Sequence, residues 1–380
     1  MFFDPSAPAV LADPYPHYAH WRARDPVHRA PTQHPIFPEQ WFLFRHADAL
    51  AALREPRLGR DWHRATEARS AASSLTAPLR ALVEMVDSWL LFQDPPRHTE
   101  LRSPLARRFT PRALAPLEPF VAASAETLLA GLRGRDSFDL LAEYALPLTS
   151  GAIARVLGIP AAERARFVAV MRGLEPVFGG NRAQLPRAAA AAAEVARSFE
   201  PLVAGPDRAQ AVATAILLFG AGFATTVHAI ANGVLALIRH PAECARLRAE
   251  PALLPSAVEE ILRFDPPLQR SQRFALEPVE IGGVSIPRGA LIVPVLGSAN
   301  RDPEAFADPD RFDVARDARA QVGFGGGIHL CLGAWLARLE VRVALEALLR
   351  ALPRLELADE RLEWREGAAR GVRRLLLAGA

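Results

Sequence analysis

The chain has 380 residues, 50% of them hydrophobic, which is enough to bury a large core. Its net charge is only +3, and all 45 basic residues are arginines spread along the chain, which argues against a nucleic-acid-binding stripe. Two cysteines make no disulfide framework at this length, and the first residues lack the basic and apolar segments of a secretory signal. We therefore expect one domain over residues 1–380, located in the cytoplasm, with no nucleic acid or membrane as partner.

The first sixty residues are expected to mix short helices and strands. A helix starts after Asp13, and Trp41-Phe-Leu-Phe predicts a strand before a helix from Asp48. These signals predict a small sheet near the N-terminus. Residues 62–80 are rich in Ala, Ser and Thr with weak periodicity, which predicts a loop that helps to cover a ligand.

A Pro-Pro pair at 95–96 predicts the start of a helix that carries His98 and Arg102 four residues apart. On a helix the two share a face and can converge on one anion. Taken alone, such a pair is more often solvated surface, because charged residues are mostly exposed. Arg107, Arg108 and Arg112 are candidates for a basic patch that docks an acidic partner.

Residues 114–200 are expected to be largely helical, with breaks at Pro147, Pro160, Pro176 and Pro186. Residues 211–238 contain no acid, lysine or arginine, so by length alone they could span a membrane. His228, Asn232 and three threonines favour instead a helix buried through the middle of a soluble domain.

Glu260 and Arg263 lie three residues apart on a predicted helix, a spacing that is common on surfaces and is worth a few tenths of a kcal/mol there. Downstream, the alternating segment from Arg273 turns at Gly282-Gly283, which predicts a hairpin.

The most informative stretch is 321–340, where Cys331 lies between a glycine-rich approach and an amphipathic helix from Leu332. The glycines at 325–327 allow backbone conformations closed to other residues, and Gly333 is expected to permit tight packing beside the sulfur. A helix N-terminus favours a thiolate, which could bind a metal. The alternative is a buried free cysteine, the interpretation that we give to Cys244.

The pattern Phe324-x-x-Gly327-x-His329-x-Cys331-x-Gly333 resembles the haem-ligand signature of the cytochrome P450 family. The resemblance implies a mainly α fold with small β-sheets in a single domain and haem b bound through Cys331. The interval from Phe199 to Ala211 is short, so one helix before the central distal helix is expected to be missing.

The resemblance also assigns the other site residues. His98, Arg102, Arg273 and His329 would hold the haem propionates, and Phe324, Gly325 and Gly333 would contact the cofactor. Ala221, Gly222 and Thr225 match the family's Ala-Gly-x-acid-Thr-Thr motif, so Thr225 would hold a water that delivers protons, but Ala224 stands where an acid is usual. Glu260 and Arg263 would form a structural triad with Arg311.

The implied function is a monooxygenase that inserts one atom of O2 into a mostly apolar small molecule by hydroxylation or epoxidation, with electrons from a ferredoxin-type partner. Two alternatives remain open, namely a nitric oxide reductase-like enzyme, because some relatives with alanine at this position act so, and a non-catalytic haem protein that serves as a docking module. The substrate walls are expected from residues 62–90, 165–186, 217–223 and 268–269.

Overall fold

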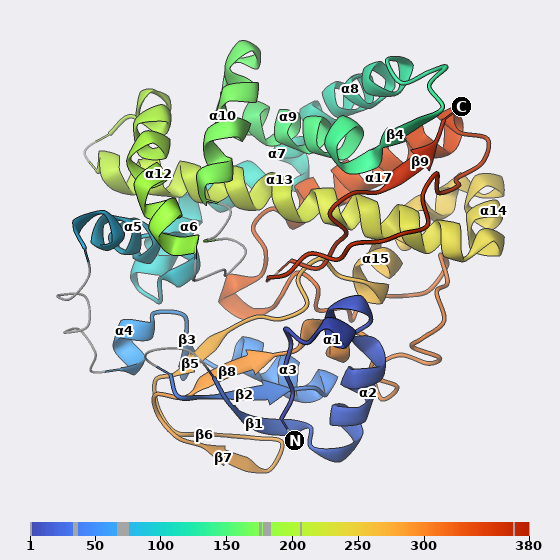
Figure 1. Ribbon diagram of the computed structural model, residues 1–380. Coiled ribbons are helices and arrows are strands. Elements are labelled where there is room, and N and C mark those ends of the chain that lie inside the picture. Colours follow the sequence, from blue (N-terminus) through green and yellow to red (C-terminus); the bar gives the residue numbers. More distant parts are fainter. Residues whose placement is uncertain are drawn as a thin grey trace.

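The computed structural model describes residues 2–32, 37–66, 76–174, 177, 184–205, 207–367 and 369–379. Most helices gather in one layer, and the main sheet lies below it with the N-terminal helices (Figure 1). The α-helices are α1 (Pro8–Ala12), α2 (Tyr15–Arg24), α3 (His46–Arg54), α4 (Trp62–Ala65), α5 (Ala77–Asp87), α6 (Arg97–Ala106), α7 (Pro111–Leu114), α8 (Glu118–Ala130), α9 (Leu146–Leu157), α10 (Arg164–Met171), α12 (Leu185–Phe199), α13 (Arg208–Arg239), α14 (Pro241–Ala249), α15 (Leu254–Phe264), α16 (Leu296–Ala299) and α17 (Ala334–Ala351).

The main sheet has five strands in the order β1-β2-β8-β5-β3. Only the β2–β8 pair is parallel, and the other neighbours are antiparallel. Two small sheets pair β4 with β9 and β6 with β7, and the second turns at Gly282-Gly283 with positive φ at both residues, as the sequence predicts. The strands are β1 (Val27–Pro31), β2 (Glu39–Leu43), β3 (Leu58–Gly59), β4 (Ser137–Asp139), β5 (Arg273–Ala275), β6 (Val279–Ile281), β7 (Val284–Ile286), β8 (Leu291–Pro294) and β9 (Leu376–Ala378).

Helix α13 crosses the helical layer and packs against α9, α12, α15 and α17 (Figure 1). The side chain of Asp207 caps it by accepting from Gln210 N at 3.2 Å. Because α13 is apolar on all sides, most of its surface has to be covered, and the surrounding helices bury it except around residues 221–225. Both α13 and the segment Leu140–Leu157 are apolar and long enough to cross a membrane, but 61% of the most apolar window of each is buried inside the fold, as in core helices.

Several local predictions need correction. Residues 62–80 are not one loop: Asp61 caps α4 by accepting from His63 N at 3.0 Å, and α5 starts at Ala77, while 67–75 lie outside the described residues. Pro147 does not break the chain, because it sits in the first turn of α9, where no N–H is needed, directly after the π-helix Leu140–Ala145. Pro176 also lies outside the described residues.

The expected missing helix is confirmed in the part of the chain that the structure describes. Between α12 and α13 there is only a short 3₁₀ turn, Glu200–Leu202. Helices α10 and α12, which we call the roof, therefore precede α13, the central helix, with only this turn between α12 and α13. Near the C-terminus, Arg373 N donates to Glu363 O and Arg365 N to Gly371 O, which pairs these two segments in an antiparallel manner.

Candidate functional site

The glycine loop before α17 folds tightly back on itself. Cys331 N donates to Phe324 O at 2.9 Å, and Gly325 and Gly327 have φ of 75° and 66°. Gly327 also lies against the backbone carbonyl of Leu53 on α3, where any side chain would collide. The prediction that these glycines adopt conformations closed to other residues is therefore confirmed at Gly327. Its close approach to α3 is a second reason for glycine, which the sequence did not indicate.

Gly333 caps α17 with an ordinary φ of −84°, and a side chain there would meet no atom within 4 Å. The expectation that it permits tight protein packing is wrong, since the space beside it is open.

Cys331 is exposed where it lines a hollow of about 380 Å³, yet protein surrounds it closely enough that burial raises the pKa of its thiol. The Gly333 N–H, Arg102 and Arg338 act in the opposite direction but do not outweigh burial. The helix N-terminus was expected to favour the thiolate, but its effect on the pKa is smaller than the effect of burial. The thiolate therefore forms readily only when a cation binds to it.

Cys331 has no partners for an all-protein metal site. Among the described residues, no group of three His, Cys, Asp or Glu side chains is arranged to hold a metal ion. A metal at this sulfur would therefore take most of its ligands from a cofactor, as iron does in a porphyrin.

Two buried histidines lie beside the loop. His98 of α6 and His329 have ring centroids 4.4 Å apart, and Nε2 of His98 is buried without a hydrogen-bond partner. Nε2 of His329 has no partner within hydrogen-bond distance either, and it lies 4.0 Å from Asp94 Oδ1. Burial lowers the pKa of both rings, with Arg102 adding to the effect on His98. It lowers the pKa of His329 to about 4, opposed by Asp94 and assisted by Arg60 and Arg273. Buried ring nitrogens without a partner are rare, so they indicate a polar ligand group.

Arg60 and Arg273 form a second part of this site. Both are buried, and burial lowers the pKa of Arg60 to about 9 and of Arg273 to about 10. The carboxylate that acts on both is Asp94, which already accepts from the backbone N–H of Arg60 at 2.8 Å and of Asp61 at 3.2 Å. Buried positive charge exceeds negative charge here, which favours a bound carboxylate.

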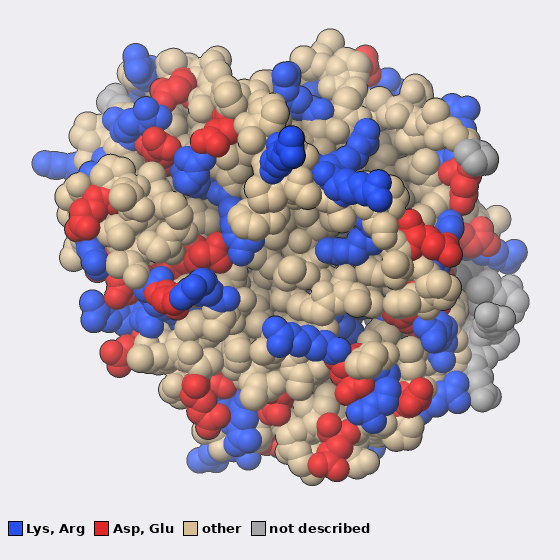
Figure 2. Space-filling view, turned by 180° about the vertical axis from the view of Figure 1, so that it is seen from behind, with Lys and Arg blue, Asp and Glu red and all other residues tan. Residues whose placement is uncertain are grey.

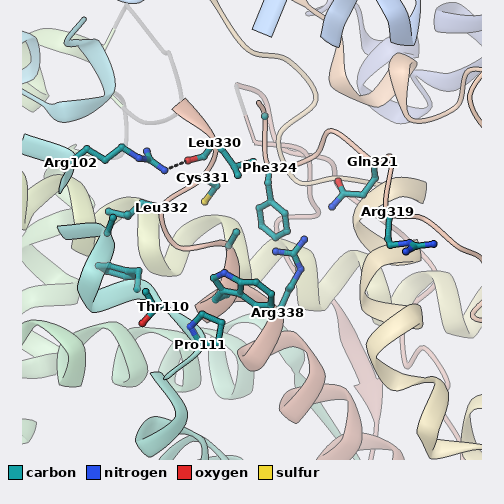
Figure 3. Close-up of a pocket in the computed structure, with 15 residues that line it drawn as sticks. Arg102, Thr110, Pro111, Arg319, Gln321, Phe324, Leu330, Cys331, Leu332 and Arg338 are labelled. Carbon is teal, nitrogen blue, oxygen red and sulfur yellow. Dashed lines mark hydrogen bonds between the residues drawn. The ribbon is translucent and has the colours of Figure 1, made fainter. Parts of the chain in front are cut away.

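Arg102 does not join this group directly. Its Nη2 donates to Leu330 O at 2.6 Å, along one side of Cys331, while Phe324 and Arg338 lie on the other side (Figure 3). The guanidinium of Arg338 lies 4.5 Å from the Phe324 ring centroid and donates to Glu259. Arg102 and Arg338 thus fix the ligand loop from both sides.

The middle of α13 is the part of this helix that neighbouring elements leave uncovered. Ala221 is exposed and residues 222–225 are partly exposed, although the flanking residues of the helix are buried. The Thr225 hydroxyl donates to Ala221 O at 3.1 Å, which holds it on this open face. Gly222 faces the other way, because a side chain there would lie 2.7 Å from Ile153 of α9. Its lack of a side chain therefore serves helix packing.

The predicted triad contains a different arginine. Fully buried Arg263 forms a bidentate pair with Glu260 at 2.6 and 2.8 Å, and the second arginine on Glu260 is Arg316 at 3.3 Å. Arg311 is 64% exposed and contributes only its carbonyl, which accepts from Arg263 at 3.2 Å. The prediction of Arg311 is wrong because the chain turns there with its side chain outward.

A model of the family "Cytochrome P450" matches residues 200–359. The chain is 39% identical to the Vitamin D(3) 25-hydroxylase of Pseudonocardia autotrophica, over 96% of this chain and 93% of that protein. It is a cytochrome P450. This P450 is also 38% identical to the monooxygenase PikC of Streptomyces venezuelae, covering 91% of this chain and 85% of that protein. A structure of P450BioI bound to an acyl carrier protein that carries hexadec-9Z-enoic acid has a TM-score of 0.89 and 30% identity, with 98% and 100% of the chains covered.

As a cytochrome P450 monooxygenase the protein binds haem, and the site fits this cofactor. A thiol without protein co-ligands, open space beside Gly333, an open stretch on α13 and unpartnered nitrogens near buried arginines are all features that a haem would use. Sequence reasoning missed Arg60 and Asp94. Their only signal was position, in a Gly-Arg-Asp turn and an Asp-Pro-Pro turn, and neither turn is specific.

Proposed function

We propose that this P450 inserts one oxygen atom from O2 into a C–H or C=C bond of a mostly apolar small molecule. The observation that carries this proposal is Cys331, held on a rigid glycine loop beside open space within an apolar fold. Bound haem with a thiolate ligand supplies the chemistry, because the thiolate donates electron density that favours cleavage of the O–O bond.

The chain's own residues would position the cofactor and exclude water. Cys331 would be the iron ligand, and the unpartnered nitrogens of His98 and His329 would donate to propionates together with nearby arginines. Thr225 would hold a proton donor on the open face of α13. The proposed haem contacts are His98, Arg102, Ala221, Arg273, Phe324, Gly325, His329, Cys331 and Gly333, with Arg60 added and Gly222 removed, because Gly222 packs against Ile153.

The apolar character of the substrate is supported by the packing of the roof on α13. Phe167 of α10 and Phe199 of α12 pack edge to face at 4.8 Å, and Phe219 of α13 lies 5.8 Å from Phe199. Phe223 continues this row at 5.4 Å toward the open stretch of the helix. The first three rings are buried in the core, and Phe223 is the partly exposed end of the row. An aromatic surface at this position favours hydrocarbon over charge.

One expected wall residue lies elsewhere. The Gln269 side chain is buried in a polar cluster, where its Nε2 donates to Pro266 O at 2.8 Å and lies 3.3 Å from Asp265. It therefore serves the packing of the N-terminal segment. Residues 175–176 and 178–183, within another expected wall, lie outside the described residues.

The proposal of a ferredoxin-type electron donor is supported by one face of the molecule. Figure 2 shows a hollow near the centre of that face, bordered by arginines. Exposed Ile328, Leu330 and Trp335 lie at the ligand loop, and the hollow beside Cys331 contains Arg102, Arg319 and Arg338. Arg107, Arg108 and Arg112 are exposed next to residues that line it. An apolar centre with a basic rim suits a small acidic protein.

A second proposal concerns how the substrate is presented. The likeness to P450BioI with its acyl carrier protein raises the option that the substrate arrives on such a carrier. Exposed arginines on the roof, which an acidic carrier would contact, favour it. They are Arg166, Arg172, Arg187 and Arg197.

A substrate screen followed by turnover tests these proposals. Hexadec-9Z-enoic acid, free and attached to an acyl carrier protein, vitamin D3 and a macrolide are titrated while the haem band is followed for a blue shift. The compounds that shift the band are incubated with ferredoxin, its reductase and NADH, and the products are analysed. Oxygenated product supports the monooxygenase assignment. Rapid NADH consumption that occurs only with nitric oxide would support the reductase. Tight binding of the acyl carrier protein without turnover of any compound would support the docking module.

A further inference from the structure

A second hollow, of about 30 Å³, lies where three segments of the chain meet, and we call it the N-terminal hollow. Among the described residues it shares no wall with the hollow beside Cys331. Its polar walls include Tyr18 of α2, Arg270 and Arg370. The meeting point is fixed by the backbone, because Arg370 N donates to Pro267 O at 2.7 Å.

Arg270 brings a positive charge to the N-terminal hollow without an opposite charge beside it. Its side chain forms no ion pair or hydrogen bond with another residue that the structure describes. Burial lowers the pKa of Arg270, opposed by Tyr18 and Asp4. The Asp4 carboxylate is already engaged, since Ser6 N and Oγ donate to it at 2.8 and 2.6 Å. A largely enclosed guanidinium without a counter-ion is costly, so its presence here indicates a ligand.

The neighbouring arginine differs from Arg270 in this respect. Arg370 donates from Nε to Asp265 at 2.8 Å and from Nη1 to Leu11 O at 2.7 Å. The same Asp265 oxygen accepts from the Tyr15 hydroxyl at 2.5 Å. No aspartate or glutamate is among the described residues that line the hollow, so its charge is positive overall.

Tyr18 adds a second donor to the N-terminal hollow. It is only 3% exposed, yet its hydroxyl has no hydrogen-bond partner among the described residues, whereas buried tyrosine hydroxyls usually find one. Its ring is held by Phe3 and Phe44, with centroids 5.9 and 6.2 Å away. Burial raises the pKa of Tyr18 to about 12, so the hydroxyl keeps its proton near neutral pH and can donate it to a hydrogen bond.

We propose that the N-terminal hollow binds the carboxylate of a small organic acid, which accepts hydrogen bonds from the Arg270 guanidinium and the Tyr18 hydroxyl. A guanidinium matches the two oxygens of a carboxylate, and one unpaired charge suits a monoanion. The walls beside these donors include Val10 and Leu11, which suit a short hydrocarbon. The space is roughly twice what one water needs, which limits the bound part to the size of acetate. The inference does not depend on the oxygenase activity proposed above.

Thermal unfolding of the haem-loaded protein tests the site. Sodium acetate and sodium chloride are titrated separately at pH 7 into wild type, Arg270→Gln and the control Arg288→Gln, an exposed arginine between β7 and β8. Acetate should raise the midpoint of wild type and control saturably, by about 2 °C more than chloride at about ten times its dissociation constant. Arg270→Gln should respond equally to both salts.

Two results of this titration would overturn the proposal. One is a response to acetate in Arg270→Gln that equals that of wild type, and the other is a wild type that responds equally to acetate and chloride. Without acetate, Arg270→Gln should be at least as stable as wild type, because it removes an unpaired charge. A large loss of stability there would mean that Arg270 has a structural partner and would also contradict the site.

Tyr18→Phe tests the second donor, because it keeps the ring and removes only the hydroxyl. It should weaken acetate binding several-fold, and an unchanged affinity would contradict a site with two donors. Hexadec-9Z-enoic acid and its methyl ester then identify the source of the carboxylate. If Arg270→Gln weakens the haem-band shift of the acid but not of the ester, the carboxylate belongs to a substrate. If both shifts are unchanged while the acetate response is lost, the site takes a free small acid.

Discussion

Arg60 Nη1 and Arg273 Nη1 donate to the same two oxygen atoms, Ser271 Oγ at 3.2 and 3.1 Å and Gln272 O at 3.0 and 2.8 Å. Two buried cations thus lie side by side on neutral acceptors. Burial lowers the pKa of both, and Arg273 lowers that of Arg60 further. An anion bound between or beside them would stabilise both charged forms. We interpret the pair as one half of the propionate site, with His98 and His329 nearby.

Replacing Arg60 should therefore separate haem binding from folding. In Arg60→Gln, haem should be lost to apomyoglobin roughly 10- to 100-fold faster, because one charge-assisted hydrogen bond of ~1.5–3 kcal/mol is removed. The apoprotein should unfold no more easily than wild type, since repulsion from Arg273 is relieved.

The matched control is Arg57→Gln, which removes an arginine three residues away that is paired with Glu55 at the surface. Haem transfer from this variant should equal that of wild type. Equal haem loss from Arg60→Gln and Arg57→Gln would place the propionates elsewhere.

The sequence predicted the ligand loop well, because its constraints are local. The positive φ of Gly325 and Gly327 and the return of Cys331 to Phe324 arise within ten residues, so their pattern is visible in the chain. Arg60 gave no such signal. Its role depends on β3 lying beside β5, which brings it next to Arg273 from more than two hundred positions away.

The iron ligand is tested with the two cysteines. Cys331→Ala should lose the absorption of the reduced carbon monoxide complex that is typical of thiolate-bound haem. Cys244→Ala should keep it, because Cys244 is buried in the core on α14 and lies away from the loop. The reverse pattern would disprove the ligand assignment.

Docking of the electron donor should depend on charge at the hollowed face. Arg112→Glu should raise the KM for ferredoxin about tenfold at low salt, and the difference should shrink as salt is added, because exposed charges are screened. Peroxide-driven oxidation should not change. Arg24→Glu, an exposed arginine at the end of α2, serves as the control and should leave the KM unaltered. An equal rise in KM for Arg112→Glu and Arg24→Glu would mean that ferredoxin responds to the net charge of the protein. It would contradict a docking site on this face.

Glu340 and Arg316 show why some buried polar residues and their partners could not be predicted from the sequence. On a helical wheel Glu340 is one more polar residue of α17, and its environment depends on how α17 packs against α13. Arg311 and Arg316 lie in the same turn-rich stretch, and the sequence does not show which of them pairs with Glu260. The way this stretch folds decides that Arg316 reaches Glu260. Contacts between distant elements carry no local pattern.

Glu340 of α17 is fully buried, and neither of its side-chain oxygens has a hydrogen-bond partner. This burial leads to a prediction about how stability depends on pH. The folded-state pKa of Glu340 is raised well above its ordinary value, whereas in the unfolded chain it returns to about 4.3. Between these two values the folded state binds the extra proton. The stability that this group contributes is therefore fully present below the unfolded pKa and is lost as pH rises toward the folded pKa.

Glu340→Gln removes this titration and keeps the shape of the side chain. The variant should match wild type in thermal midpoint near pH 4.5 and become progressively more stable than wild type as pH rises from 5 to 8. The slope should approach 1.4 kcal/mol per pH unit in the free energy of unfolding, the value for one proton. Glu346→Gln should show no such trend, because Glu346 is half-exposed. A wild type that gains stability over Glu340→Gln as pH rises would mean that the carboxylate is ionised and paired in the folded protein.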